Sequence, residues 1–300
     1  MKPGSDDGSR SAELLSWRIG DVKVTRVIEE ETTSEYSEQY PFIREADPAA
    51  LLDISWLQPH FVTPEGAVKW STHALLVEAP GGVKLVVDTC VGNDKVRRYL
   101  GDKALSTEFL KRFAETGCRR EEVAAVVCTH LHVDHVGWNT MLGPNGRWLP
   151  TFPNARYLIG ATEYEHWRGD PGEEEQKILA DSVQPLFDLG IVDLVESDHR
   201  ISPEIRLLPT PGHTPGHVGV EIASQGERAL ITGDLIHHPC QLAHLDWATD
   251  YDVDRAAATA TRRAFVCEAT DQPVLIIGTH FATPTAGRIV RDGEVFRLAV

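Results

Sequence analysis

The short segment THLHVDH, residues 129–135, constrains the fold of this chain more than any other feature. It places His130, His132, Asp134 and His135 within six positions, directly after the apolar run VAAVVC. Histidine nitrogens and carboxylate oxygens are the usual ligands of zinc and similar divalent ions in catalytic sites. A strand followed by a tight loop can aim such side chains at one point. The segment therefore predicts a metal site at the end of a buried strand.

Four further apolar runs end in the same way. They read VVDT, LLPTPGH, LITGD and LIIGTH, and they deliver Asp88, His213, Asp234 and His280. Because a buried strand brings its last side chain to the edge of its sheet, these ends can converge on one rim. We therefore expect His213, Asp234 and His280 to complete the set of ligands.

The predicted strands come in groups rather than in strict alternation with helices. This grouping favours an α/β (α+β) fold in which two packed mixed sheets are flanked by helices, an αββα sandwich. The strand-like runs are 17–29, 71–79, 83–89, 123–130, 155–161, 204–210, 217–224, 228–234 and 273–280. Helical patterns lie near 103–117, 173–189 and 254–270. Asp292 and Gly293 predict the turn of a terminal hairpin.

The length of 300 residues suits one such unit, which we expect to span residues 15–300. Residues 1–14 are polar and rich in glycine and serine, so we interpret them as a disordered tail. Residues 30–70 look irregular apart from a short helix near 48–53. This segment is interpreted as either a lid or the arm of a homodimer, and the sequence does not choose between them.

Charge and composition exclude several classes of partner. The net charge is −16, and an acidic chain repels polyanions, so we expect no nucleic-acid partner. No run approaches eighteen apolar residues, so we expect no membrane partner. The first residues contain no apolar signal segment, and five cysteines without CxxC spacing fit reduced thiols. These features predict a cytoplasmic protein.

The HxHxDH segment with its distant histidines and aspartate resembles the metallo-β-lactamase-fold hydrolase superfamily, over roughly residues 17–300. The resemblance implies two divalent metal ions, with zinc expected first and manganese, cobalt or iron as alternatives. It implies that Asp234 bridges the two ions and that Asp88 orients a ligand or its loop from behind. The resemblance further assigns His130, His132 and His213 to one ion, and Asp134, His135 and His280 to the other.

Within that superfamily, the GDLIH run and the terminal hairpin resemble the methyl parathion hydrolase and lactonase-like branch. Class B β-lactamases lack an aspartate that bridges in the position of Asp234. Glyoxalase II relatives bind glutathione through a C-terminal helical region, whereas this chain ends in a predicted hairpin. Acyl homoserine lactonases carry a tyrosine three residues after the bridging aspartate, and His237 stands there in this chain.

The chemistry expected of this branch is hydrolysis by a hydroxide that bridges the metals. Two divalent ions, Asp134, Asp234 and that hydroxide leave a net charge of about +1. Such a site favours neutral small molecules that become anionic in the transition state, namely esters, lactones and organophosphate triesters. His237 is expected to act as general acid or to bind the substrate. Trp138 and Phe281 are expected to line an apolar pocket.

Three other functions remain open at this stage. The same centre can hydrolyse a thioester or an amide, including a β-lactam. A related site with iron supports an oxidoreductase or a sulfur dioxygenase, whose members generally keep one metal. A non-catalytic binding scaffold is expected to lose ligands. All seven ligand positions are filled here, which favours a hydrolase over the last two.

Overall fold

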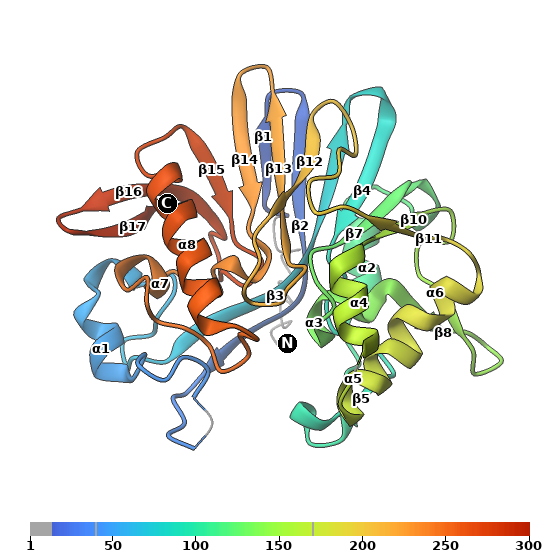
Figure 1. Ribbon diagram of the computed structural model, residues 1–300, viewed down its shortest axis with the longest axis horizontal. Coiled ribbons are helices and arrows are strands. Elements are labelled where there is room, and N and C mark those ends of the chain that lie inside the picture. The colour runs from blue at the N-terminus through green and yellow to red at the C-terminus, as the bar shows by residue number, and fades with distance from the viewer. Residues whose placement is uncertain (1–13, 40, 170) are drawn as a thin grey trace, which may run out of the picture.

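The computed structural model describes residues 14–39, 41–169 and 171–300. Two mixed sheets stand side by side in the middle of the molecule, with helices on both outer sides (Figure 1). This is the predicted αββα sandwich. The tail expected over residues 1–14 lies outside the described residues, apart from its last position, Leu14.

The first sheet has seven strands in the order β1-β2-β3-β4-β7-β10-β11. Strands β4, β7, β10 and β11 pair in parallel, and the remaining pairs are antiparallel. The tight turn Pro80–Gly82 joins β3 to β4. The strand bounds are β1 Ser16–Ile19, β2 Val22–Ser34, β3 Val68–Ala79, β4 Val83–Val87, β7 Ala125–Cys128, β10 Arg156–Gly160 and β11 Val192–Val195.

The second sheet has six strands in sequence order, and only β14 and β15 pair in parallel. Its strands are β12 Ile205–Pro209, β13 Val218–Ser224, β14 Glu227–Ile231, β15 Val274–Ile277, β16 Ala286–Asp292 and β17 Val295–Ala299. The turn between β16 and β17 contains Gly293 in the left-handed region, as the Asp292–Gly293 pair predicts. Two small hairpins are formed by β5 Val96–Arg97 with β6 Lys103–Ala104, and by β8 Thr140–Leu142 with β9 Trp148–Pro150.

Helices cover the outer faces of the sheets. On the side of the second sheet lie α1 Pro48–Asp53, α7 Cys240–Ala243 and α8 Arg255–Ala269 (Figure 1). On the side of the first sheet lie α2 Phe109–Glu115, α3 Val133–Val136, α4 Ala161–Gly169, α5 Glu173–Ile178 and α6 Gln184–Asp188. Asp254 caps α8 by accepting from the amide of Ala257. No helix in the described part of the chain combines the length and hydropathy that a membrane crossing requires.

Two helical predictions need correction. The helix expected at 103–117 begins only at Phe109, because residues 103–104 form β6 against β5. The helix expected at 173–189 is helical throughout, but the π-helical turn Leu179–Val183 separates α5 from α6. A π turn inserts one extra residue into the helical repeat, which a period of 3.6 residues does not foresee.

The interior between the sheets is made by both of them. Leu75 and Val77 of β3 and Val127 of β7 pack with Val220 of β13 and Ile231 of β14 in one apolar cluster. The two sheets therefore share one core, and their strand ends are held at one common edge.

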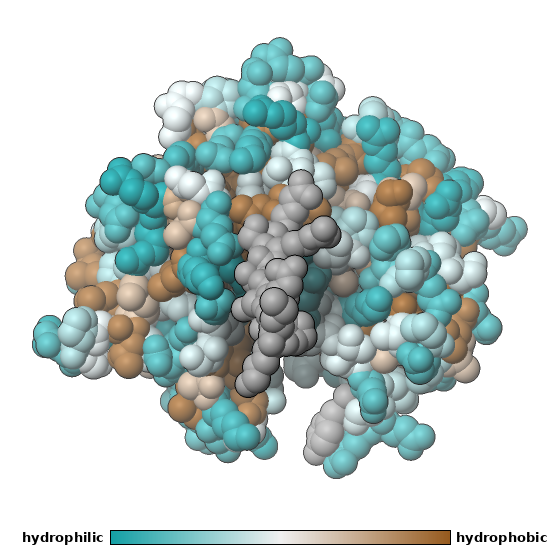
Figure 2. Space-filling view, turned by 180° about the vertical axis from the view of Figure 1, so that it is seen from behind, coloured by the Kyte–Doolittle hydropathy of each residue, from teal (hydrophilic) through white to brown (hydrophobic). Residues whose placement is uncertain are grey.

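At the surface, apolar residues form separated patches among hydrophilic ones on the face seen from behind (Figure 2).

Residues 30–70 are anchored to this body. Leu51, Leu57 and Phe61 are buried in the cluster that also includes Val266 of α8. Two predicted features are present, the helix at 48–53 and a largely irregular path on either side of it. That the segment acts as a lid or a dimer arm stays a prediction.

Candidate metal centre

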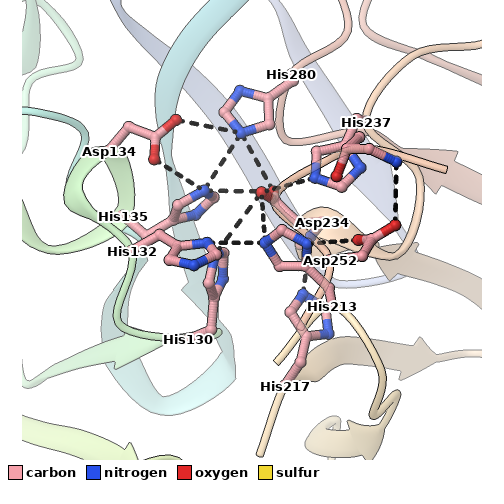
Figure 3. A network of polar contacts seen from close by, with 12 residues as sticks. His130, His132, Asp134, His135, His213, His217, Asp234, His237, Asp252 and His280 are labelled. Atoms are coloured by element: carbon pink, nitrogen blue, oxygen red, sulfur yellow. Dashed lines mark hydrogen bonds and ion pairs between the residues drawn. The ribbon is translucent and has the colours of Figure 1, made fainter. Parts of the chain in front are cut away.

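The predicted ligands converge at one edge of the two sheets (Figure 3). His130 and His132 follow β7, and Asp134 and His135 lie on the short helix α3. The other three follow strands of the second sheet: His213 after β12, Asp234 in the turn after β14 and His280 after β15. Strand ends thus bring together residues that are up to 150 positions apart.

A first group of donor atoms comprises His130, His132, His213 and Asp234. Nδ1 of His132 lies 3.0 Å from Nε2 of His130 and 2.8 Å from Nε2 of His213. Oδ2 of Asp234 lies 3.3 Å from Nε2 of His213 and 3.7 Å from Nε2 of His130. Ligand atoms about 2.0–2.1 Å from one tetrahedral ion lie about 3.3 Å from each other, so this group has the spacing of a zinc-type site.

A second group comprises Asp134, His135 and His280. The two Nε2 atoms of the histidines are 3.2 Å apart, and the Asp134 oxygens lie 3.5 and 3.6 Å from them. Oδ1 of Asp234 completes the group, at 3.3 Å from His135 and 3.1 Å from His280. Asp234 thus turns one carboxylate oxygen to each group.

The charges and lone pairs of this centre call for a cation. Burial, followed by the neighbouring imidazoles, lowers the pKa of His130 and of His132 well below the ordinary value. Each of these two rings is therefore neutral and has one unprotonated nitrogen that can bind a cation. Oδ1 of Asp234 is buried without a hydrogen-bond partner. Burial opposes protonation of His135, but the carboxylates of Asp234, Asp134 and Asp88 outweigh it and raise its pKa well above the ordinary value. Divalent ions supply the positive charge that these donors lack.

Each histidine of the centre except His132 is held by its other ring nitrogen. Nδ1 of His135 donates to Asp88 at 2.9 Å, and Nδ1 of His213 donates to Asp252 at 2.8 Å. Nδ1 of His280 points to the Ser71 carbonyl at 3.2 Å. These contacts leave Nε2 free toward the centre, which is how proteins orient metal-binding imidazoles. Asp88 also accepts, through Oδ1, from the amide of Thr129 at 2.8 Å, and its role in orienting the ligands stays a prediction.

Two supporting residues are not evident from the sequence. Asp252 lies 39 positions after His213, in a loop without a motif that signals the pairing. His217 lies directly before β13; its Nε2 accepts from the amide of Asp234 at 2.8 Å, while Nδ1 faces Thr210. The HTPGH repeat around it is the available signal, because its second histidine lies four residues after a ligand.

His237 lies beside the centre, as the sequence predicted. It is 2% exposed, and its Nε2 is 3.2 Å from Oδ2 of Asp234. Its ring is parallel to that of His280 at 6.3 Å and packs edge-on against that of His213 at 4.7 Å. Neither ring nitrogen has a hydrogen-bond partner of good geometry. The imidazole therefore lies against His213 and Asp234 of the first group, with its ring facing that of His280.

The two aromatic residues expected in the pocket lie elsewhere. Trp138 is 3% exposed, stacks on Phe109 at 5.3 Å and donates from Nε1 to Glu29 at 2.7 Å. Phe281 is fully buried against Phe61. Both side chains are packed in core clusters, so the substrate contacts predicted for them have no support from their positions.

Other aromatic rings border the centre instead. Phe42 packs edge-on against His237 at 5.3 Å, Trp70 against His280 at 5.8 Å and Trp167 against His132 at 5.2 Å. We call these three residues the aromatic collar. The Asp134 side chain is 30% exposed, so the centre opens to solvent on the side of α3.

Comparisons with known proteins agree with this geometry. A profile of the metallo-beta-lactamase superfamily matches residues 67–280. An N-acyl homoserine lactonase of Bacillus sp is 28% identical over 109 residues, which are 36% of this chain and 36% of that protein. The probable metallo-hydrolase Mb2322c of Mycobacterium bovis is 26% identical over 192 residues, 55% of this chain and 57% of that protein. The matched stretches thus span well under two thirds of these relatives.

Solved structures match over nearly the whole chain. The dizinc quorum-quenching lactonase AidC has a TM-score of 0.76 at 20% identity, covering 95% of this chain and 96% of its own. The hydrolase AbOPH has a TM-score of 0.77 at 22% identity, covering 96% and 97%. At this level of identity the likeness establishes the fold.

Proposed function

Because this chain belongs to the metallo-beta-lactamase superfamily, we propose that it is a dinuclear metal-dependent hydrolase of neutral lactones, esters or organophosphate triesters. The observation that carries the proposal is the pair of donor groups joined by Asp234, with spacings that suit two ions. The nitrogen-rich donor set and the dizinc neighbour favour zinc. Two divalent ions held there supply Lewis acidity and a water-derived nucleophile at neutral pH.

Residues of the chain would position the two ions and the substrate. Asp234 fixes the spacing of the two groups, since each of its oxygens serves one of them. His237 lies beside Asp234, with Nε2 3.2 Å from its Oδ2, and an N–H of its ring can donate a hydrogen bond to a substrate oxygen as charge develops on it. The aromatic collar lines the approach with apolar surface, which suits an uncharged substrate.

The substrate class is supported by charge. The chain carries a net charge of −16, and Asp134 stands at the open side of the centre. Both features disfavour polyanionic substrates. The curated relatives include N-acyl homoserine lactonases, and a lactone meets the requirement for a neutral substrate that becomes anionic during attack. A small neutral molecule is the proposed partner.

The deciding experiment is hydrolysis of a matched panel by zinc-loaded protein. The panel contains an acyl homoserine lactone, a simple γ-lactone, an aryl ester, a dimethyl aryl phosphotriester, a thioester and a β-lactam. We expect turnover of one of the first four, lowered by more than about a hundredfold in His132→Ala. His60→Ala removes an exposed histidine and serves as the control. Turnover confined to the thioester or the β-lactam would overturn the proposed substrate class.

A further inference from the structure

A buried glutamate on α4 contacts the main chain around the first group. Glu163 is 1% exposed and lies in the first turn of the helix. Its Oε1 accepts hydrogen bonds from the amide of Leu131 at 3.1 Å and from Nε1 of Trp167 at 2.6 Å. Its Oε2 accepts from the amide of Gly216 at 3.1 Å. Three N–H donors from three segments thus meet on one carboxylate.

Two of these donors sit next to ligands of the first group. Leu131 lies between His130 and His132 in the chain. Gly216 lies three residues after His213 and directly before the histidine whose Nε2 accepts from the amide of Asp234. The carboxylate therefore joins the segment after β7, in the first sheet, to the segment after β12, in the second. Hydrogen bonds to a carboxylate are stronger than those between neutral groups, so we expect this junction to restrict relative movement of the two segments.

The third donor, Trp167, contacts the predicted ligand His132 through its indole ring. Trp167 is one helical turn after Glu163, and its indole packs edge-on against the His132 ring at 5.2 Å. His132 is also the one imidazole of the centre that faces it through Nδ1. Glu163 therefore holds both the amide of Leu131, which precedes His132 in the chain, and the indole of Trp167, which packs against the His132 ring.

The helix and the His213 segment are in direct backbone contact. A Cβ on Gly216 would lie 2.2 Å from the amide nitrogen of Glu163, so the two backbones are packed too closely to admit a side chain at Gly216. Interiors packed in this way transmit small displacements. A change in the acceptor geometry of Glu163 is therefore expected to shift the first group, while the second group is held by Asp88 and Ser71.

We propose that Glu163 is a positioning residue that sets the geometry, and hence the metal affinity, of the first group through the amides of Leu131 and Gly216 and the ring of Trp167. This inference rests on the proposed dinuclear function and deepens it. It separates the two groups, because it assigns to one carboxylate an effect on His130, His132 and His213 that Asp134, His135 and His280 do not share.

The chain offers a matched comparison. Glu29 is 2% exposed and also accepts three N–H donors, from the amides of Val91 and Gly92 and from Nε1 of Trp138. None of these donors adjoins a residue of the first group in the chain. Glu29→Gln therefore imposes the same chemical change, an amide facing N–H donors, at a place where the proposal expects no selective effect on the first group.

The test measures metal binding at each group without reference to turnover. Cadmium-113 NMR of the fully loaded protein gives separate signals for a site of three histidines and one aspartate and a site richer in carboxylate. Competition with a chromogenic chelator then gives the zinc affinities of wild type, Glu163→Gln, Trp167→Phe and Glu29→Gln. We expect Glu163→Gln to weaken the first group by about 10–100-fold and to perturb its signal. The second group should stay within about twofold.

Trp167→Phe keeps the ring over His132 and removes one donor, so we expect a smaller loss confined to the same group. If Glu163→Gln does not fold, this variant decides, and an unchanged first group in it overturns the proposal. An equal loss at both groups, or the same loss in Glu29→Gln, also overturns it, because either reflects general destabilisation. Failure of the wild type to bind two ions would instead refute the proposed function.

Discussion

At the residue scale, the two ring nitrogens of the imidazoles in the centre make different contacts. One nitrogen of His135, His213 and His280 is tied to a carboxylate or a carbonyl, and the other faces the centre. The sequence could identify the residues that converge at the centre, because their types and positions at the ends of apolar runs are local features. It could not identify Asp252 or Glu163, because their roles depend on contacts between segments that are far apart in the chain.

The first prediction concerns Asp252. Replacing it by asparagine keeps the size of the side chain, removes its charge and turns an N–H group toward either His213 or the amide of Thr249. We expect zinc affinity of the first group to fall by about 10–100-fold, as measured by chelator competition. Asp250→Asn changes an exposed carboxylate in the same loop and should leave the affinity unaltered. Equal affinities in the two variants would contradict the orienting role.

The second prediction concerns a buried lysine. Burial lowers the pKa of Lys95 to about 8, although its ammonium donates to Thr140 and lies over the ring of Trp148. The folded state therefore loses this proton at lower pH than the unfolded chain does, so the unfolded chain holds more protons between about pH 8 and 10.5. Over that interval, the wild type should gain stability with rising pH relative to Lys95→Met, by about 1.4 kcal/mol for each pH unit.

Urea unfolding at pH 7.5, 8.5 and 9.5 measures this difference between the two proteins. Parallel pH profiles would show that Lys95 keeps an ordinary pKa in the folded state. Comparing the profiles, rather than the absolute stabilities, cancels the titration of other groups that both proteins share.

At the scale of elements, long sequence patterns predicted the strands and helices correctly, whereas short segments were predicted poorly. The predicted strands of both sheets and the capped helix α8 are present, because apolar periodicity and capping are local signals. The hairpin of β5 and β6 replaced part of a predicted helix. Trp138 and Phe281 turned inward because backbone direction after a ligand depends on tertiary contacts. One such contact is the approach of residues 91–92 to Gly137.

That approach gives the third prediction. A Cβ on Gly137 would lie 1.8 Å from the carbonyl oxygen of Val91, so Gly137→Ala must displace one of the two backbones. We expect a loss of at least about 2 kcal/mol in the free energy of unfolding, measured with urea. Gly169→Ala places its methyl group where nothing lies within 4 Å and should be nearly neutral. Equal stabilities would show that the loop relaxes freely.

At the scale of the whole molecule, the centre ties the two sheets together. Its histidines and aspartates come from the ends of β7, β12, β14 and β15, so an ion in the first group bridges both sheets. The sandwich itself was predictable from the grouping of strands. How the segment 30–70 contributes to it was not, because its buried residues are scattered among turns without a period.

The fourth prediction is that metal removal destabilises the whole chain. An ion present at a thousand times its dissociation constant stabilises the folded state by about 4 kcal/mol. For a chain of this size, each kcal/mol corresponds to about 1.6 °C in Tm. Chelation should therefore lower Tm by about 6 °C, as followed by circular dichroism. In the double variant His132→Ala, His280→Ala the chelator should have little effect, and an equal fall there would exclude the centre as its cause.

The turn Pro80–Gly82, between β3 and β4, stands at the other end of the strand that leads to Asp88. Gly81 and Gly82 have open space around them, since a methyl group added to either would meet no heavy atom within 4 Å. Sequence added at this turn would leave the ligand-bearing strand ends untouched. The turn is therefore suited to the attachment of a fluorescent reporter or a surface tether, which would leave the edge that carries the two donor groups exposed to solution.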